Sequence, residues 1–247
     1  MIILVFETTG AYASAACIDE RGDIMEEVSA GALSHLESLM PMTEALLSKK
    51  GITAKDVSCV AVSAGPGSFT GIRIGVSTAR AFAQAMAIPC VAVPTLHTFL
   101  YNIRGFSGIA CPILDARRDQ VYGGAFSLTK SSGIEEYVFG GAYGIDEYLE
   151  LLLKSFPEAG VKDLMFFGDG INKYRPEIEE WQRSSLKSDI RLEFAGAGGM
   201  FQKASSAAIL ALKLYNEGRI ISYPELEPVY MRKAEAERKL EAGLLFL

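Results

Sequence analysis

The stretch from residue 63 to residue 84 reads SAGPGSFTGIRIGVSTARAFAQ, and it contains a strand end, a glycine loop and a helix in direct succession. The apolar run 57–63 predicts a buried strand. Gly65 and Gly67 flank a proline, which lets the backbone turn sharply, and Thr70 is a plausible cap for the helix that follows. Strand, loop and helix in this order are typical of α/β domains, and a helix amino terminus beside such a loop is suited to an anion.

The glycines of this stretch have two readings. The loop lacks both the Gly-Lys-Ser/Thr ending of a P-loop and the G-x-G-x-x-G pattern, so a bare glycine turn explains it as well as a nucleotide site does. Within the helix, Gly71, Gly75, Ala79 and Ala83 lie four apart on one face, which allows close approach of another element. Packing inside the protein and an interface with another protein both account for this row.

The two halves of the chain begin alike. Each half opens with a hairpin, and strands alternating with helices follow it, so we expect mixed sheets covered by helices. The first half predicts strands at 2–6, 13–18, 24–28, 57–63 and 90–93 and helices at 34–50 and 70–87. The second half predicts strands at 109–114, 120–127, 135–140 and 164–168 and helices at 145–153 and 205–216. We therefore expect two related domains, 1–104 and 105–247, with a final helix after Tyr230 that fits either one.

The helix at 34–50 carries more apolar surface than one sheet covers. Leu36, Leu39, Met40 and Leu47 belong to a set that spreads over about half of the circumference, wider than the ~100° stripe of an ordinary surface helix. This pattern predicts a second packing partner, and the alternative is a core helix sandwiched inside its own protein. Ser34 can cap this helix, and Pro41 is expected to kink or restart it.

Composition sets further limits. The 247 residues are 49% hydrophobic and 22% charged, which is typical of folded globular chains. A net charge of -6 opposes unaided binding to a phosphate backbone, so any nucleic-acid role should be indirect. The first apolar run is too short for a signal peptide or a membrane span, which favours a cytoplasmic protein. Four cysteines in apolar settings and two distant histidines, His35 and His97, do not suggest a metal site.

Beyond the 63–84 segment, further motifs run along most of the chain in a fixed order: ILVFETT, SHLESLMP, VAVPTLHTF, PILDARRDQVYGGAF, FFGDG and EPVYMR. Together they resemble the TsaB/YeaZ family. That family is similar to the acetate kinase, sugar kinase, Hsp70 and actin (ASKHA) superfamily. The resemblance implies two related domains, each an α/β unit with a mixed five-stranded sheet flanked by helices.

The resemblance also implies a role. Family members bind the catalytic subunit TsaD, which transfers threonylcarbamoyl from an adenylate to the adenosine next to the tRNA anticodon, and a TsaE ATPase joins that complex. TsaD proteins hold a metal with two histidines, and Thr95 and Phe99 stand at the matching positions here. The chain is thus expected to be a non-catalytic subunit without metal or cofactor, and His97 and His35 are expected to cap helices, pack in the core or line an interface.

Two groups of residues follow from these expectations. A remnant nucleotide site would use Glu7, Thr8, Thr9 and Asp115, and the alternative function is an ASKHA-type small-molecule kinase or ATPase with magnesium at Glu7 and Asp115. A metallopeptidase reading is undermined by the missing histidine pair. The surface for a TsaD-like subunit, or for a second copy in a homodimer, would combine the helices at 34–50 and 70–87. Its predicted members are Leu36, Leu39, Met40, Leu47, Gly71, Ile72, Gly75, Ala79 and Phe82.

Overall fold

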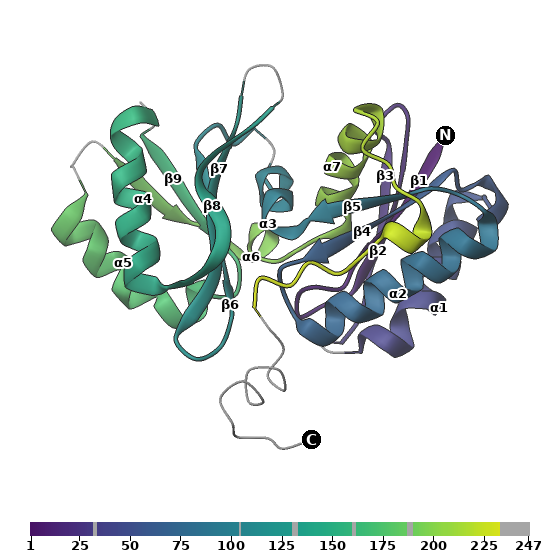
Figure 1. The fold of residues 1–247 in the computed structure, drawn as a ribbon, viewed down its shortest axis with the longest axis horizontal. Coiled ribbons are helices and arrows are strands. Elements are labelled where there is room, and N and C mark those ends of the chain that lie inside the picture. The colour runs from purple at the N-terminus through teal and green to yellow at the C-terminus, as the bar shows by residue number, and fades with distance from the viewer. Residues whose placement is uncertain (32–33, 104, 130–132, 160–161, 187–189, 233–247) are drawn as a thin grey trace.

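The computed structural model describes residues 1–31, 34–103, 105–129, 133–159, 162–186 and 190–232. They form two lobes, each built on a five-stranded mixed sheet flanked by helices (Figure 1). The predicted fold class is therefore confirmed. The final helix expected after Tyr230 falls mostly on residues 233–247, which lie outside the described residues.

The two sheets have the same topology. The first is ordered β3-β2-β1-β4-β5 and the second β8-β7-β6-β9-β10 when read from its matching edge. In each, the first strand is antiparallel to the second and parallel to the fourth, as in β1 with β2 and β4. The strands are β1 (Ile2–Glu7), β2 (Ser14–Asp19), β3 (Ile24–Val28), β4 (Cys59–Gly65), β5 (Cys90–Pro94), β6 (Ile109–Asp115), β7 (Gln120–Leu128), β8 (Ile134–Gly144), β9 (Asp163–Phe167) and β10 (Arg191–Phe194).

Helices cover the sheets on defined faces. Residues of α1 and α2 pack on one face of the first sheet, α7 covers its other face, and residues of α4 and α5 share a core with the second sheet. Short helices connect the lobes. The α-helices are α1 (His35–Lys50), α2 (Phe69–Met86), α3 (Thr95–Thr98), α4 (Ile145–Ala159), α5 (Ile171–Ser185), α6 (Ala197–Met200) and α7 (Ala204–Asn216), and the 3-10 helices are η1 (Ala54–Asp56), η2 (Phe99–Tyr101) and η3 (Tyr223–Glu225). No helix among the described residues is long and apolar enough to cross a membrane.

The chain returns to the first lobe after the second sheet is complete. Ala207 and Leu210 of α7 are buried against Ile3, Val5 and other residues of the first sheet. We therefore propose that the first domain consists of 1–104 together with α7 and η3, which modifies the simple division at residue 104.

Residues 226–232, which we call the C-terminal strap, then cross from one lobe to the other (Figure 1). Leu226 is buried in the core of the first lobe, and the Val229 amide donates a 2.8 Å hydrogen bond to the carbonyl of Ala64. At the other end, Nη1 of Arg232 donates to the carbonyl of Ala116, 2.5 Å away at the β6–β7 turn of the second lobe. The strap thereby links the two lobes directly.

Several boundaries differ from prediction. Helix α2 starts at Phe69 and its cap is Ser68, whose Oγ accepts from the Gly71 amide at 3.2 Å, so the prediction of Thr70 as the cap was wrong. Ser34 stands at the amino end of α1, but its hydroxyl donates to the Gly31 carbonyl and makes no capping bond. Helix α1 runs through Pro41 as one helix, so the predicted restart at this proline does not occur. The predicted kink stays a prediction.

Candidate functional site between the lobes and along helices α1 and α2

The predicted nucleotide site centres on Glu7, at the end of β1. The side chain is fully buried, and its Oε1 accepts hydrogen bonds from the Thr9 amide at 2.6 Å and the Thr9 hydroxyl at 2.5 Å. Its Oε2 and the nearby Ser63 hydroxyl are buried without a hydrogen bond that meets standard geometry. Burial raises the pKa of Glu7, since it disfavours the charged form. A buried carboxyl of this kind is suited to bracing the β1–β2 turn and poorly placed to orient water around a magnesium ion.

The glycine row of α2 packs against the turn after β1. The Thr8 hydroxyl donates to the Gly71 carbonyl at 2.7 Å, and the Ser68 amide donates to the Thr9 carbonyl at 2.8 Å. A Cβ atom added to Gly71 would lie 1.9 Å from the Thr8 carbonyl oxygen, and one on Gly75 would lie 2.3 Å from the Thr8 hydroxyl. The turn therefore packs closely against the first two turns of α2. Internal packing accounts for the glycines at 71 and 75.

The amino terminus of α7 is also occupied by groups of the chain itself. The amide of Ala204, at the start of α7, donates to the Ser14 hydroxyl at 2.9 Å. The Ser205 amide and hydroxyl both donate to the carboxylate of Glu26, each at 2.8 Å. A carboxylate is favoured at the positive end of a helix dipole, so Glu26 of β3 takes the place that an external anion could fill.

Replacing Glu26 by alanine is expected to destabilise the protein by about 1 kcal/mol, because the first turn of α7 loses its acceptor and its charge complement. Replacement by glutamine should keep one acceptor and cost less. Urea denaturation of both variants measures the difference. Equal stability of the alanine variant and the unchanged protein would show that the contact contributes nothing to folding.

The β1–β2 turn is covered from a third side by Gln202. This side chain comes from the segment between α6 and α7, is buried, and would lie 2.6 Å from a Cβ atom added to Gly10. Ser14, Glu26 and Gln202 were not predicted as site residues. They are distant from the glycine loop in sequence, and no motif marks them.

Asp115 lies in the second lobe with a different set of partners. Its amide donates to Oδ1 of Asp169 at 3.0 Å, and its own Oδ1 accepts from the Arg117 amide at 2.8 Å. Burial raises the pKa of Asp169. Among the described residues, no hydrogen bond or ion pair joins Asp115 to Glu7, Thr8 or Thr9, and no group of three side chains with metal-ligating atoms occurs. The structure thus divides the four predicted nucleotide-site residues between two separate clusters.

His97 connects the lobes near α3. Its Nε2 lies 3.0 Å from Oε1 of Glu136 on β8, and its ring meets Phe126 edge-on at a centroid distance of 4.5 Å. Burial lowers the pKa of His97 and the charge of Arg219 adds to this, while Glu136 acts in the opposite direction. The neutral imidazole can therefore donate one hydrogen bond to the carboxylate, as a core residue would. His35 is also buried, with Nε2 2.9 Å from the Gly10 carbonyl.

The lowered pKa of His97 gives a pH dependence with a defined sign. The unfolded chain binds the proton near pH 6.5, whereas the folded protein binds it only at lower pH, so stability should fall as pH drops below about 6.5 and level off below the folded pKa. His97→Gln should flatten this slope. Chemical denaturation at pH 7.5, 6.5 and 5.5 tests it, and an unchanged slope in the variant would assign the effect to other groups.

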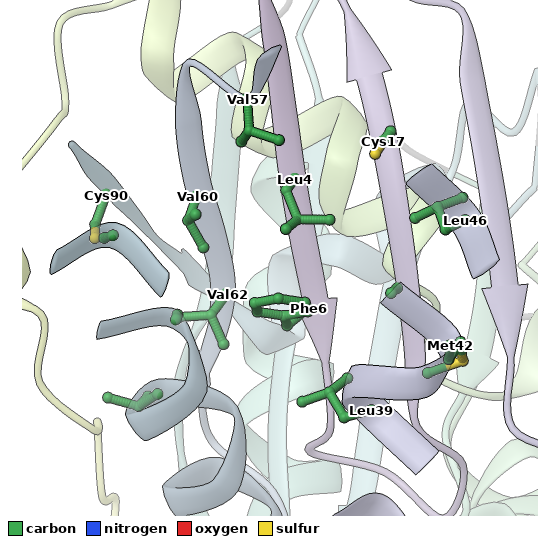
Figure 2. Packing of buried hydrophobic residues seen from close by; sticks show 14 of the residues in the cluster. Leu4, Phe6, Cys17, Leu39, Met42, Leu46, Val57, Val60, Val62 and Cys90 are labelled. Carbon is green, nitrogen blue, oxygen red and sulfur yellow. The ribbon is translucent and has the colours of Figure 1, made fainter. Parts of the chain in front are cut away.

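The predicted surface on α1 and α2 divides into exposed and buried parts. Leu36 is 76% exposed and Met40 49%, one helical turn apart, and Phe82 is half-buried. Figure 2 shows Leu39 directed into the core beside Phe6 and Val62. The buried members of the predicted set pack inside their own lobe in the isolated chain, and their part in an interface with a partner stays a prediction. They are Leu39, Leu47, Gly71, Ile72, Gly75 and Ala79.

Comparison with known proteins agrees with this architecture. A family model described as "TsaD: tRNA N6-adenosine threonylcarbamoyltransferase" matches residues 26–239. The chain is 30% identical to a Bacillus subtilis protein named tRNA threonylcarbamoyladenosine biosynthesis protein TsaB, over 97% of both chains. It is 24% identical to the Escherichia coli protein of that name, over 97% of this chain and 98% of the other. The crystal structure of YeaZ from Pseudomonas aeruginosa superposes with a TM-score of 0.75 at 22% identity, covering 93% of this chain and 99% of that one. With this similarity along its whole length, the chain belongs to the TsaB/YeaZ family.

Proposed function

We propose that this chain is a non-catalytic subunit in the biosynthesis of threonylcarbamoyladenosine in tRNA, and that it binds and activates a TsaD-like catalytic subunit. The relatives named TsaB support the pathway. The observation that supports the non-catalytic role is that the chain's own groups pack against the first turns of α2 and α7 and against the β1–β2 turn, namely Thr8, the Glu26 carboxylate and Gln202. In this proposal the TsaD-like partner carries out the catalysis, and this chain acts by binding it.

The proposed contact surface is the exposed side of α1 with the adjoining edge of α2. Leu36 and Met40 share one face because they are four residues apart, and such a pair can enter a groove between partner helices. Burying a leucine of this kind contributes roughly 1.5–3 kcal/mol. A partner that presents this groove in only one of its conformations would be stabilised in that conformation, which is how binding can activate it.

Other features of the assembly follow from the same proposal. The family model that matches most of the chain is named for a transferase, so a TsaD-like partner should have a similar fold. The helices of the partner that correspond to α1 and α2 can then pack against α1 and α2 of this chain. Without that partner, the same patch can join two copies of the chain in a homodimer. A TsaE-like ATPase completes the assembly. The net charge of -6 leaves tRNA contact mainly to the partners, and the complex acts in the cytoplasm.

The kinase or ATPase alternative is not favoured. It requires Glu7 and Asp115 to share one magnesium ion, and they belong to separate hydrogen-bonded clusters. Titration calorimetry with ATP and magnesium should therefore detect no saturable binding to the isolated chain.

The proposal is tested by mixing the chain with the TsaD-like subunit of the same organism and measuring the mass of the complex by light scattering after size exclusion. Leu36→Asp and Met40→Asp should each weaken the complex at least tenfold, since each places a charge in an apolar contact. Ile209→Asp is the matched control: Ile209 is 38% exposed on α7, which covers the opposite face of the first sheet.

Two outcomes would contradict the proposal. If no complex forms with the unchanged protein, the partner is wrong. If a complex forms and all three variants bind equally, the partner stands and the surface is wrong. Substitution at Gly75 does not serve this test, because any side chain there meets Thr8 within the same molecule. Activity of the reconstituted subunits on tRNA, lost without this chain, tests activation separately from binding.

A further inference from the structure

Helices α4 and α5 lie next to each other on the second lobe, at the end of the molecule away from α1 and α2 (Figure 1). Between them runs an open groove of about 540 Å³. Three apolar residues in its lining, Leu149, Pro176 and Trp181, are here called the floor, and carboxylates make up most of the remaining lining. We propose that this groove is a docking site for a basic, amphipathic segment of a partner protein, which lays an apolar side chain on the floor and lysines or arginines against the carboxylates.

The charge of the groove is the first argument. Among the described residues, its lining includes Asp146, Glu150, Glu177 and Glu180 and no lysine or arginine. Glu150 pairs with Lys154 at 3.6 Å and Glu180 with Arg183 at 2.7 Å, but these pairs are largely exposed and therefore weak. Asp146 and Glu177 make no ion pair with any residue that the structure describes. A cationic partner can therefore gain contacts that the described part of the chain leaves unmade.

The helix dipole does not explain the carboxylates that α5 contributes to the groove. Asp146 lies in the first turn of α4, where the helix dipole favours a negative charge. Glu177 and Glu180 stand in the middle and later part of α5, where the dipole gives no such benefit. Glu180 also pairs with Arg183 inside the helix, so the charge of Glu177 in particular is left for a partner.

The floor supplies the apolar half of the argument. Leu149 is buried and Trp181 is 9% exposed, so both are already fixed by packing and can receive a side chain with little further ordering. Arginine and lysine have apolar stems that lie well on such a surface while their charged ends reach carboxylates. A phosphate backbone or an anionic membrane carries the wrong charge for this groove, so a protein segment is the occupant that fits. This docking site does not depend on the proposed function, and it would let the chain hold one protein at each end.

Trp181 provides a local reporter, because it is the only tryptophan of the chain. The probe is a synthetic amphipathic helical peptide of leucine and lysine, titrated while the tryptophan emission is recorded. Saturable change is expected, with an affinity that falls as salt rises. The double variant Asp146→Asn with Glu177→Lys should weaken binding at least tenfold.

The matched control is Glu37→Gln with Glu44→Lys on α1, which changes the net charge by the same amount at the other end of the molecule. It should leave the affinity unchanged within twofold. Circular dichroism of both variants establishes that each is folded. Equal weakening by the two double variants would mean unspecific attraction and would overturn the proposal. So would spermidine binding as tightly as the peptide, because the apolar floor would then have no part in recognition.

Discussion

Replacing Gly71 by alanine is expected to lower the free energy of unfolding by about 3–5 kcal/mol, or to prevent folding. The added methyl group would lie 1.9 Å from the carbonyl oxygen of Thr8, and the nearest atoms on that side belong to the backbone of the β1–β2 turn, which cannot move aside as a flexible side chain can. The turn would have to separate from α2 and lose the hydrogen bond between the Thr8 hydroxyl and the Gly71 carbonyl. Urea denaturation followed by circular dichroism gives the measurement.

Gly144→Ala is the control for this experiment. A Cβ atom there would meet no atom within 4 Å, and the residue does not adopt a left-handed conformation, so its stability should change by less than about 1 kcal/mol. If Gly71→Ala were as stable as this control but failed to bind the TsaD-like subunit, the glycine row would belong to the interface between proteins after all. If Gly71→Ala instead loses stability as an isolated chain, the glycine row serves packing inside the protein.

Replacing Glu7 by glutamine is expected to stabilise the protein by about 1–3 kcal/mol at pH 8, because the variant removes the cost of a buried charge. Oε1 of the glutamine can still accept from Thr9, and its amide group can donate to the nearby Ser63 hydroxyl. The gain should depend on pH. Burial raises the pKa of Glu7 in the folded protein, so the unfolded chain loses its proton first as pH rises above about 4.5, and stability of the unchanged protein falls until pH passes the raised value.

The two proteins should thus differ little near pH 4.5 and most at pH 8, which denaturation curves at three pH values can establish. Glu44→Gln, an exposed carboxylate on α1, is the control and should change neither stability nor its slope. A glutamine variant that is less stable than the unchanged protein at every pH would show that Glu7 is held as a carboxylate. Magnesium binding at this site would then need to be tested again.

Much of the fold could be predicted because its signals are local. The hairpins that open each lobe are marked by apolar runs and by turn residues such as those between Asp19 and Asp23, and the strand, loop and helix after residue 57 follow from apolar residues and glycine. Helix α5 was missed, although Ile171, Tyr174 and Ile178 have helical spacing. Its residues are polar on average, and Pro176 lies inside it, which argues against a helix when only the sequence is read. Strand β10 has four residues, too few for alternation to be recognised.

The contacts around the β1–β2 turn and the start of α7 could not be predicted, for a different reason. The pattern of Gly71 and Gly75 shows that something approaches closely, but only the fold shows that it is Thr8 of the same chain. The contact between Glu26 and Ser205 joins residues 179 positions apart, and no periodicity in one sequence reports such a pair. The apolar residues of α1 predicted the helix correctly. Which of them are exposed, as Leu36 is, and which are buried, as Leu39 is, depends on where the sheet lies, and the sequence does not show that.

The C-terminal strap has a consequence for how the protein is made. The ribosome completes Ala64 and Ala116 long before Val229 and Arg232, the residues that join them across the lobes. Each sheet can therefore form during translation, and contacts such as that between His97 and Glu136 can join the lobes before the strap is made. The hydrogen bonds of the strap have to wait until residues 226–232 have emerged. A message cut short before residue 226 would yield a chain without them, and only a translation event that reaches Arg232 yields both.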